Sequence, residues 1–192
     1  MRLLIITLLI SLSFLLKAQE LKYKISFANS DIGILTVKQT KVGHSTFIKV
    51  TSESEIKFFF TLNIKYNLTC KYTDNTLVSS SVHTYINDKL QHSSVTTKID
   101  DHYKVVKDGE ALNINYPINY SEALLFVKIP KHLTSIYSEL AAFNKNITQI
   151  KDSEYHTINP ENGYLSEYIY KNGLLQKAVI HHTLLTVRLT KI

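Results

Sequence analysis

Two histidines are the residues best placed to do chemistry together. His83 and His92 flank Asn87-Asp88, a pair that tolerates the positive φ values of a two-residue hairpin turn. In-register pairing across such a turn places His83 directly opposite His92. Cross-strand neighbours have Cβ atoms about 5 Å apart, so both imidazoles can reach one Zn²⁺ or Cu²⁺ if a third ligand arrives from elsewhere. A polar face without a metal is the alternative, and the one we favour.

The sequence brings no third ligand or catalytic partner near this pair. His156, His181 and His182 are available, but adjacent strand residues such as the last two point to opposite faces and cannot chelate one ion together. H-E-x-x-H, G-x-S-x-G, Gly-rich phosphate and paired-cysteine motifs do not occur. The serines of 79–81 and 93–94 lie in predicted strands, where cross-strand hydroxyl pairing is the expected role. We predict no catalytic residue and no cofactor.

Cys70 is the only cysteine, so no intramolecular disulfide can form. It lies on the apolar side of a strict alternation that includes Tyr66, Leu68 and Tyr72. This pattern predicts a buried thiol that packs as a small hydrophobe, with a nucleophile as the alternative.

Strands must position these side chains, because the chain combines twelve tyrosines with abundant Thr, Ile and Val in alternating patterns. Asn and Gly pairs divide it into about a dozen strands, with Asn162-Gly163 and Asn172-Gly173 as the strongest hairpin signals. Sequential hairpins without intervening helices predict an all-β antiparallel meander. A sheet of that size curls into a barrel or a strongly curved half-barrel. Polar second faces on several strands argue against an outer-membrane barrel.

One short helix is predicted from about Tyr120 to Val127. Asn119 and Glu122 have the three-residue offset of a capping box, and Pro130 ends the segment. The helix is nearly apolar throughout, so we expect it to plug or cover the sheet.

A curved sheet with an apolar helix as lid can bind an apolar or amphiphilic molecule among inward aromatic side chains. Three phenylalanines fall within residues 57–62, which form either a distorted strand corner or a helical turn. The candidate lining residues are Phe58, Phe59, Phe60, Tyr66, Tyr72, Leu124, Leu125 and Phe126. An ordinary filled core is the alternative for each of them.

Residues 1–18 have the pattern of a secretory signal peptide, with cleavage expected near Ala18/Gln19. The apolar run ends at Lys17, short of the roughly 20 residues that span a bilayer, and an uncleaved N-terminal anchor is the alternative. Residues 19–192 then form one secreted or periplasmic domain without a transmembrane span, with a formal charge of +4 instead of +6. Its lysines are dispersed and Arg188 is its only arginine, so nucleic acid is not an expected partner.

Several strand and hairpin segments resemble a family of small secreted proteins from Bacteroidota, known as domain of unknown function 6134. The segments are Tyr66-Asn-Leu-Thr69, Leu77-Val-Ser-Ser80, Tyr85-Ile-Asn87, Lys89-Leu90, Ser93-Ser94 and Tyr120-Ser-Glu-Ala-Leu-Leu125. The resemblance implies an envelope location and a β-rich fold, and it brings no functional residues.

Three functions are compatible with these observations. The leading one is a non-enzymatic secreted or periplasmic β-barrel-like binder of a lipid-like small molecule. The second is an interaction or scaffold module that docks an envelope protein through an edge strand or a tyrosine-bearing face. The third is a metal-dependent enzyme built on His83 and His92. No motif in the sequence identifies the ligand, the partner or the oligomeric state.

Overall fold

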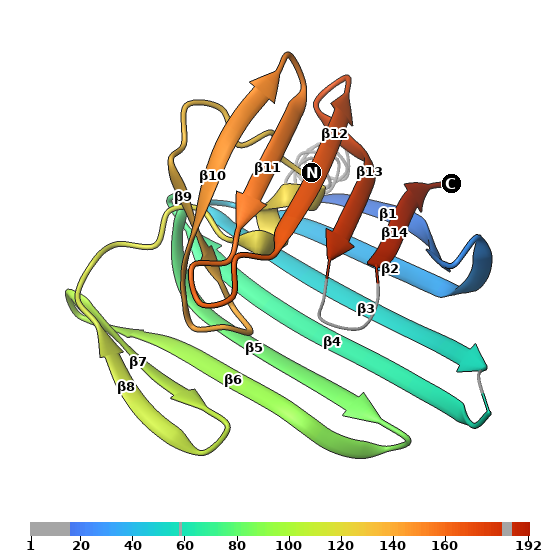
Figure 1. Ribbon diagram of the computed structural model, residues 1–192. Helices are drawn as coiled ribbons and strands as arrows, with labels where there is room; N and C mark the ends of the chain where they lie inside the picture. The colour runs from blue at the N-terminus through green and yellow to red at the C-terminus, as the bar shows by residue number, and fades with distance from the viewer. Residues whose placement is uncertain (1–15, 58, 182–185) are drawn as a thin grey trace, which may run out of the picture.

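Alternating apolar and polar residues make most of the chain extended. The computed structural model describes residues 16–57, 59–181 and 186–192. Its strands are β1 (Leu16–Phe27), β2 (Ser30–Val42), β3 (Ser45–Lys57), β4 (Thr61–Thr73), β5 (Thr76–Ile86), β6 (Lys89–Ile99), β7 (His102–Lys107), β8 (Glu110–Ile114), β9 (Ser135–Ser138), β10 (Phe143–Lys151), β11 (Glu154–Ile158), β12 (Leu165–Lys171), β13 (Leu174–His181) and β14 (Thr186–Lys191) (Figure 1).

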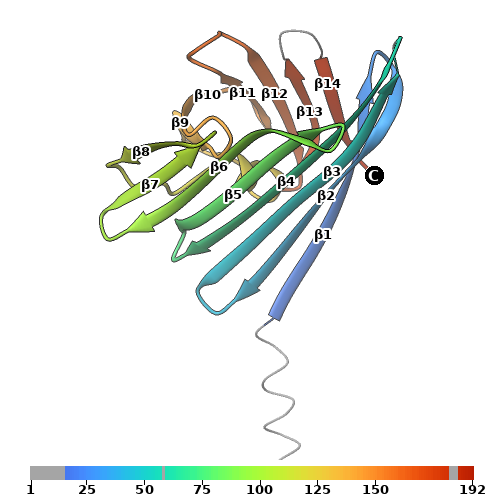
Figure 2. The same cartoon turned by 90° about the horizontal axis from the view of Figure 1, so that it is seen from below.

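The strands of the described segments form one antiparallel sheet in the order β8-β7-β6-β5-β4-β3-β2-β1-β14-β13-β12-β11-β10-β9. β1 pairs with both β2 and β14, so the first and the last of the described strands meet in the middle of the sheet. The backbone amide of Ile192 donates to the carbonyl of Lys22 at 3.0 Å beside this seam. The sheet curls strongly without pairing β8 to β9 (Figure 2). The predicted all-β meander is confirmed, in its half-barrel form.

Tight turns carry the residues that the turn geometry demands. Asn87 and Asp88 have φ values of 49° and 62°, and Asn172 and Gly173 have values of 53° and 82°. Both positions of such a turn need positive φ, which Asn, Asp and Gly adopt at least cost. Two of the predicted hairpin turns therefore form at the expected positions.

Gly33 meets a different requirement, that of close approach between strands. A Cβ atom at this position would lie 2.1 Å from the carbonyl oxygen of Glu53 on β3. Only a residue without a side chain lets β2 and β3 pack at this distance.

Tyrosines fill much of the concave side of the sheet. Tyr23, Tyr103 and Tyr137 are almost completely buried. The Tyr23 hydroxyl donates to the carbonyl of Leu175 at 3.2 Å, and the Tyr103 hydroxyl to that of Leu77 at 2.9 Å. A buried tyrosine is tolerated because its hydroxyl finds such an acceptor.

The predicted helix is a single 3-10 turn, η2 (Glu122–Phe126), in place of a helix over residues 120–127. Its N-cap is Ser121, without a side-chain cap hydrogen bond, so the expected capping box from Asn119 is wrong. Buried Ala123, Leu124 and Leu125 explain the difference, since contacts with the sheet and not local capping fix this segment. η2 lies within the curl of the sheet, as Figure 1 shows, in the covering position expected from its apolar sequence.

Of residues 57–62, all but residue 58 are described, and Lys57 at the end of β3 pairs with Thr61 at the start of β4. The described residues of this segment are strand and bend, not helix, and the chain reverses between β3 and β4. Most of the signal peptide predicted at residues 1–18 lies outside the described residues. Over the described residues, we find no helix with the length and hydrophobicity needed to span a membrane.

Candidate functional site

The concave face of β2 changes from apolar to polar along the strand. Leu35 and Val37 are buried, and the next two inward positions carry Gln39 and Lys41. Strand alternation alone produces this order, because residues two apart share one face. The interior of the half-barrel therefore becomes polar toward one end of β2.

Neighbouring strands extend this polar end into a row. Gln19 of β1 lies opposite Gln39, and Lys41 lies opposite Thr46 of β3. Thr46 in turn lies opposite Tyr72 of β4. The register therefore gathers amide, ammonium and hydroxyl groups at one mouth of the curled sheet.

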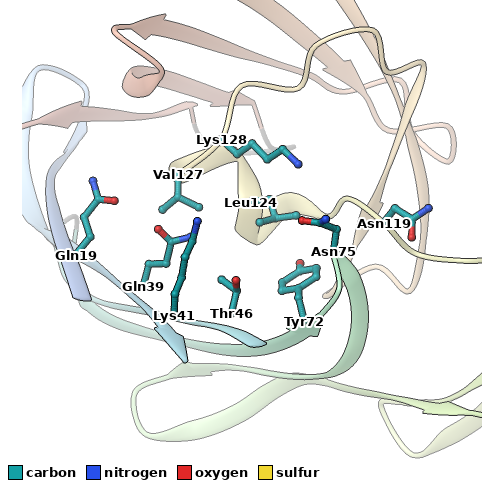
Figure 3. Close-up of a pocket in the computed structure, with 10 residues that line it drawn as sticks. All are labelled: Gln19, Gln39, Lys41, Thr46, Tyr72, Asn75, Asn119, Leu124, Val127 and Lys128. Atoms are coloured by element: carbon teal, nitrogen blue, oxygen red, sulfur yellow. The ribbon is translucent and has the colours of Figure 1, made fainter. Parts of the chain in front are cut away.

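A pocket of about 250 Å³ opens at this mouth, between the sheet and the end of η2 (Figure 3). Its lining residues are Gln19, Gln39, Lys41, Thr46, Tyr72, Asn75, Asn119, Leu124, Val127 and Lys128. Leu124 and Val127 provide apolar surface from the η2 side, while most of the other side chains are polar. The lining thus offers both kinds of contact that an amphiphilic molecule needs.

The pocket has a positive charge. Lys41 and Lys128 are its charged residues, and no carboxylate belongs to its lining. None of the ion pairs found among the described residues includes either lysine. The Lys128 ammonium lies 6.0 Å from the centre of the Tyr120 ring, a cation–π distance.

Hydroxyl groups of core tyrosines hold the η2 wall of the pocket in place. Tyr170 donates to the carbonyl of Leu125 at 2.9 Å, and Tyr120 donates to that of Lys128. The backbone amide of Lys128 also donates to the carbonyl of Leu124 at 2.9 Å. These bonds satisfy carbonyls that a short 3-10 turn leaves without partners, so they fix the position of the wall.

Tyr72 connects the pocket to a buried polar cluster. Its hydroxyl is hydrogen-bonded to the hydroxyl of Ser121, the N-cap of η2, and Ser121 donates to Oε1 of Glu139. The amide of Ala123 donates to the same carboxylate oxygen at 3.2 Å, and the thiol of Cys70 donates to it at 3.3 Å. One carboxylate therefore anchors the start of η2 to β4.

Glu139 is 1% exposed, and its Oε2 atom has no hydrogen-bond partner among the described residues. Burial raises the pKa of Glu139 to about 7, with the nearby charge of Glu122 also acting to raise it, while the hydrogen bond from Ser121 lowers it. The carboxyl group therefore changes its protonation state near neutral pH.

An ion pair borders this cluster. The Lys145 ammonium lies 2.7 Å from Oε1 of Glu122, and the Ser138 hydroxyl donates to Oε2 at 2.6 Å. Burial would lower the pKa of Lys145, but Glu122 reverses this and raises it. Lys145 thus remains charged and compensates Glu122, its ion-pair partner.

The cluster is poorly suited to nucleophilic catalysis. Cys70 is 4% exposed, and burial together with the charge of Glu139 raises the pKa of its thiol well above the ordinary value. A protonated thiol is a weak nucleophile. The prediction of a buried Cys70 is confirmed, with a hydrogen bond to Glu139 that the sequence did not indicate.

The expected pairing of His83 with His92 is wrong by one residue. A bulge between Thr84 and Tyr85 pairs Thr84 with His92 and His83 with Ser93, so the two imidazoles lie on opposite faces of the sheet. The imidazole of His83 stacks on the ring of Tyr85, with the two ring centroids 6.3 Å apart. Within the described ranges, no three His, Cys, Asp or Glu side chains are grouped to hold a metal ion.

His92 instead pairs with Asp108 at the turn between β7 and β8. Its Nδ1 atom lies 3.2 Å from Oδ2 of Asp108, whose other oxygen accepts from the backbone amide of Ser93 at 2.7 Å. These contacts give His92 a structural partner at the rim of the sheet.

The described candidate lining residues fall into three groups: two line the pocket, three belong to the core or border it, and two are exposed. Tyr72 and Leu124 line the pocket, and Tyr66, Leu125 and Phe126 belong to the core or pack against it. Phe59 and Phe60 lie at the tip of the β3–β4 hairpin with exposures of 106% and 62%, so they do not face the interior. Phe58 lies outside the described residues.

Sequence reasoning missed the polar lining and the buried acid. Gln39 and Lys41 continue the alternation of Leu35 and Val37, a signal that was present but is shared by many exposed strand ends. Nothing local marks Glu139, because glutamate is usually exposed. Its burial depends on segments distant in the sequence.

Comparison with known proteins gives a family and a fold. The profile of the family described as "Domain of unknown function (DUF6134)" matches residues 23–191. The fold is similar to that in "Crystal Structure of Beta-barrel-like Protein of Domain of Unknown Function DUF1849 from Brucella abortus", with a TM-score of 0.60, 9% identity, and coverage of 93% of this chain and 96% of that chain. At this identity the likeness concerns the fold alone. No curated protein matches significantly.

Proposed function

The chain belongs to the DUF6134 family, and from that premise we propose that it binds an amphiphilic small molecule, without transforming it, at the mouth of its half-barrel. The observation that carries the proposal is the pocket of about 250 Å³ between the sheet and η2. Apolar side chains and hydrogen-bond donors share its lining. A binder of this kind needs a preformed site and no activated group.

The chemistry of the lining supports binding over catalysis. Among the ten residues that line the pocket, none carries an imidazole, a thiol or a carboxylate. The hydroxyls of Thr46 and Tyr72 have no general base beside them in that lining. The η2 wall is held by tyrosine hydrogen bonds, so the site is preorganised and loses little conformational entropy when a ligand enters.

The site of action in this proposal is secreted or periplasmic. The signal-peptide pattern of residues 1–18 supports it. Cleavage after Ala18 would make Gln19, a lining residue of the pocket, the first residue of the mature chain. N-terminal sequencing of protein recovered from cells tests this, and a chain that retains residues 1–18 in the cytoplasm would contradict it.

Native mass spectrometry of residues 19–192, purified from the cells that make it, tests the binding function. We expect a mass in excess of the chain that disappears on denaturation, with the size of a lipid or a lipid-like molecule. The Gln39→Trp variant should lack this adduct, because the indole fills the pocket. Lys38→Trp is the matched control, since Lys38 lies on the same strand but faces outward.

The outcomes separate the alternatives. Adduct in the wild type and in Lys38→Trp but not in Gln39→Trp supports the pocket as the binding site. A bare chain mass in every preparation, together with no binding of added ten-carbon amphiphiles, rejects the proposal.

A second function, docking of an envelope protein, is favoured by one observation. Phe59 and Phe60 are exposed at a hairpin tip that projects from the sheet, and large exposed aromatics are enriched at protein interfaces. A photo-crosslinking residue at position 59 should give one discrete product in cells. The same residue at exposed Asn113 should give none, and equal labelling from both positions would reject this function.

A further inference from the structure

The pocket carries a positive charge that no acidic residue of its lining balances, and this indicates the charge of its ligand. Lys41 and Lys128 both line it, and the lining contains no acidic residue. By contrast, Lys22, Lys24 and Lys38, the other described lysine side chains of β1 and β2, each lie within 3.5 Å of a carboxylate oxygen. Among the described lysine side chains of β1 and β2, Lys41 is thus the one without an acidic partner.

The position of Lys41 follows from the strand register. It occupies the inward row of β2 beyond Leu35, Val37 and Gln39, so its stem runs along the concave face toward the pocket. A lysine can extend its methylene groups over apolar surface and present its ammonium at the rim. Lys41 is exposed at this rim, so its ammonium stays hydrated in the empty site and still attracts an anion that enters.

Lys128 lies on the η2 side of the pocket, opposite Lys41, and hydrogen bonds hold its backbone in place. Its backbone carbonyl accepts from Tyr120, and its amide donates to Leu124 at 2.9 Å. Its ammonium remains close to the Tyr120 ring, at 6.0 Å, and takes part in no ion pair within the described chain. In Figure 3, Lys41 and Lys128 approach the same space from the sheet and from the end of η2.

Uncharged donors surround the two ammonium groups. The side-chain amides of Gln19, Gln39 and Asn75 line the same pocket, and each amide NH₂ can donate two hydrogen bonds. Carboxylate and phosphate oxygens accept several such bonds together with a charge-assisted bond from lysine. Leu124 and Val127 then remain for an alkyl chain.

We propose that the ligand is an amphiphile with an acidic headgroup, a carboxylate or a phosphate, held between Lys41 and Lys128. This inference rests on the proposed binding function and specifies its ligand class. The pocket of about 250 Å³ is smaller than the roughly 300–1,000 Å³ that encloses a drug-sized molecule, so it takes the headgroup and the first carbons of the chain.

Calorimetric titration with four ten-carbon amphiphiles tests the ligand class: decanoate, decyl phosphate, decanol and decyltrimethylammonium, each below its micelle concentration. We expect the two anions to bind about tenfold or more tightly than decanol, and the cation to bind weakest. The preference for anions should decrease as the salt concentration rises. Decanoate and decyl phosphate distinguish the two headgroup chemistries.

Variants assign the preference to the two lysines. Lys41→Gln combined with Lys128→Gln should weaken binding of the anions by about tenfold and leave decanol binding within about twofold. Lys49→Gln combined with Lys104→Gln is the control, because both of these lysines are exposed on outward positions of the same sheet. Circular dichroism and the thermal midpoint confirm that each variant is folded.

The results distinguish failure of the ligand class from failure of the function. Equal binding of decanol and decanoate, or unchanged decanoate binding in the Lys41→Gln/Lys128→Gln variant, overturns the acidic headgroup and leaves amphiphile binding standing. Absence of binding for all four probes overturns the proposed function as well.

Discussion

Replacing Glu139 with glutamine should remove a large part of the pH dependence of folding stability. In the folded chain the pKa of Glu139 is about 7, against an ordinary value of 4.5. The folded state therefore holds the proton more tightly than the unfolded state does. The stabilisation by this protonated carboxyl is complete below about pH 4.5 and is lost as the pH rises through 7. The substituted glutamine keeps a carbonyl oxygen for Ser121, Ala123 and Cys70 and does not titrate.

The magnitude follows from the difference between the two pKa values. A pKa difference of one corresponds to about 1.36 kcal/mol, so the change from 4.5 to 7 represents roughly 3 kcal/mol over the full titration. Integration between pH 5 and pH 8 gives a loss of about 2–3 kcal/mol in the free energy of unfolding of the wild type. The stability of Glu139→Gln relative to the wild type should increase by this amount across the same interval.

Urea unfolding at pH 5, 6, 7 and 8, followed by far-ultraviolet circular dichroism, measures this relative stability directly. Titrating groups distant from Glu139 contribute equally to both proteins and cancel in the difference. Glu161→Gln is the matched control, because it makes the same change of side chain at an exposed position in the loop between β11 and β12. A pH-independent difference for Glu139→Gln, within about 0.5 kcal/mol, would refute the reasoning.

Three further substitutions or modifications test the packing. Tyr137→Phe leaves the buried Thr96 hydroxyl without its partner at 2.8 Å, so the free energy of unfolding should fall by about 1–2 kcal/mol in urea titrations. Gly33→Ala places a Cβ atom 2.1 Å from the carbonyl oxygen of Glu53 and should cost about 2–3 kcal/mol, visible as a lower thermal midpoint. Cys70 should react with a thiol reagent about 1,000-fold more slowly in the native protein than in denaturant, because its thiol is buried and its pKa is raised. Rapid native labelling would contradict the last expectation.

Local patterns were sufficient for the sheet because each hairpin is specified by residues close in sequence. Asn87-Asp88 and Asn172-Gly173 adopt positive φ, and the alternation around Cys70 assigns its side chain to the concave face. A meander of this kind pairs neighbours along the chain, so period-two patterning and turn chemistry determine most of it.

The register of the histidines was not predictable in the same way. The hairpin turn formed as expected, but a bulge between Thr84 and Tyr85 moved His92 opposite Thr84. A bulge shifts the pairing by one residue and transfers a side chain to the other face. No turn residue marks this shift, so the metal hypothesis depended on a register that the sequence does not specify.

The site depended on long-range packing. Tyr72 is hydrogen-bonded to Ser121, 49 residues away in the sequence, and Cys70 is hydrogen-bonded to Glu139, 69 residues away. No local periodicity of the sequence encodes such bonds. The predicted helix failed for the same reason, because burial of Leu124 and Leu125 and not a capping box fixes η2. The pocket lies where these contacts hold η2 against the sheet.

The seam between β1 and β14 gives the chain a definite order of assembly. Every other pair of neighbours among the described strands is consecutive in sequence, whereas Tyr23 pairs with Lys191. The hairpins on either side can therefore form as short loops close, while one edge of β1 has no partner until the last strand has been made. Strand addition from another chain competes for that edge during this interval. β1 is thus the last strand to complete its pairing, and the time that β14 takes to reach it sets how long this edge of β1 stays open to aggregation.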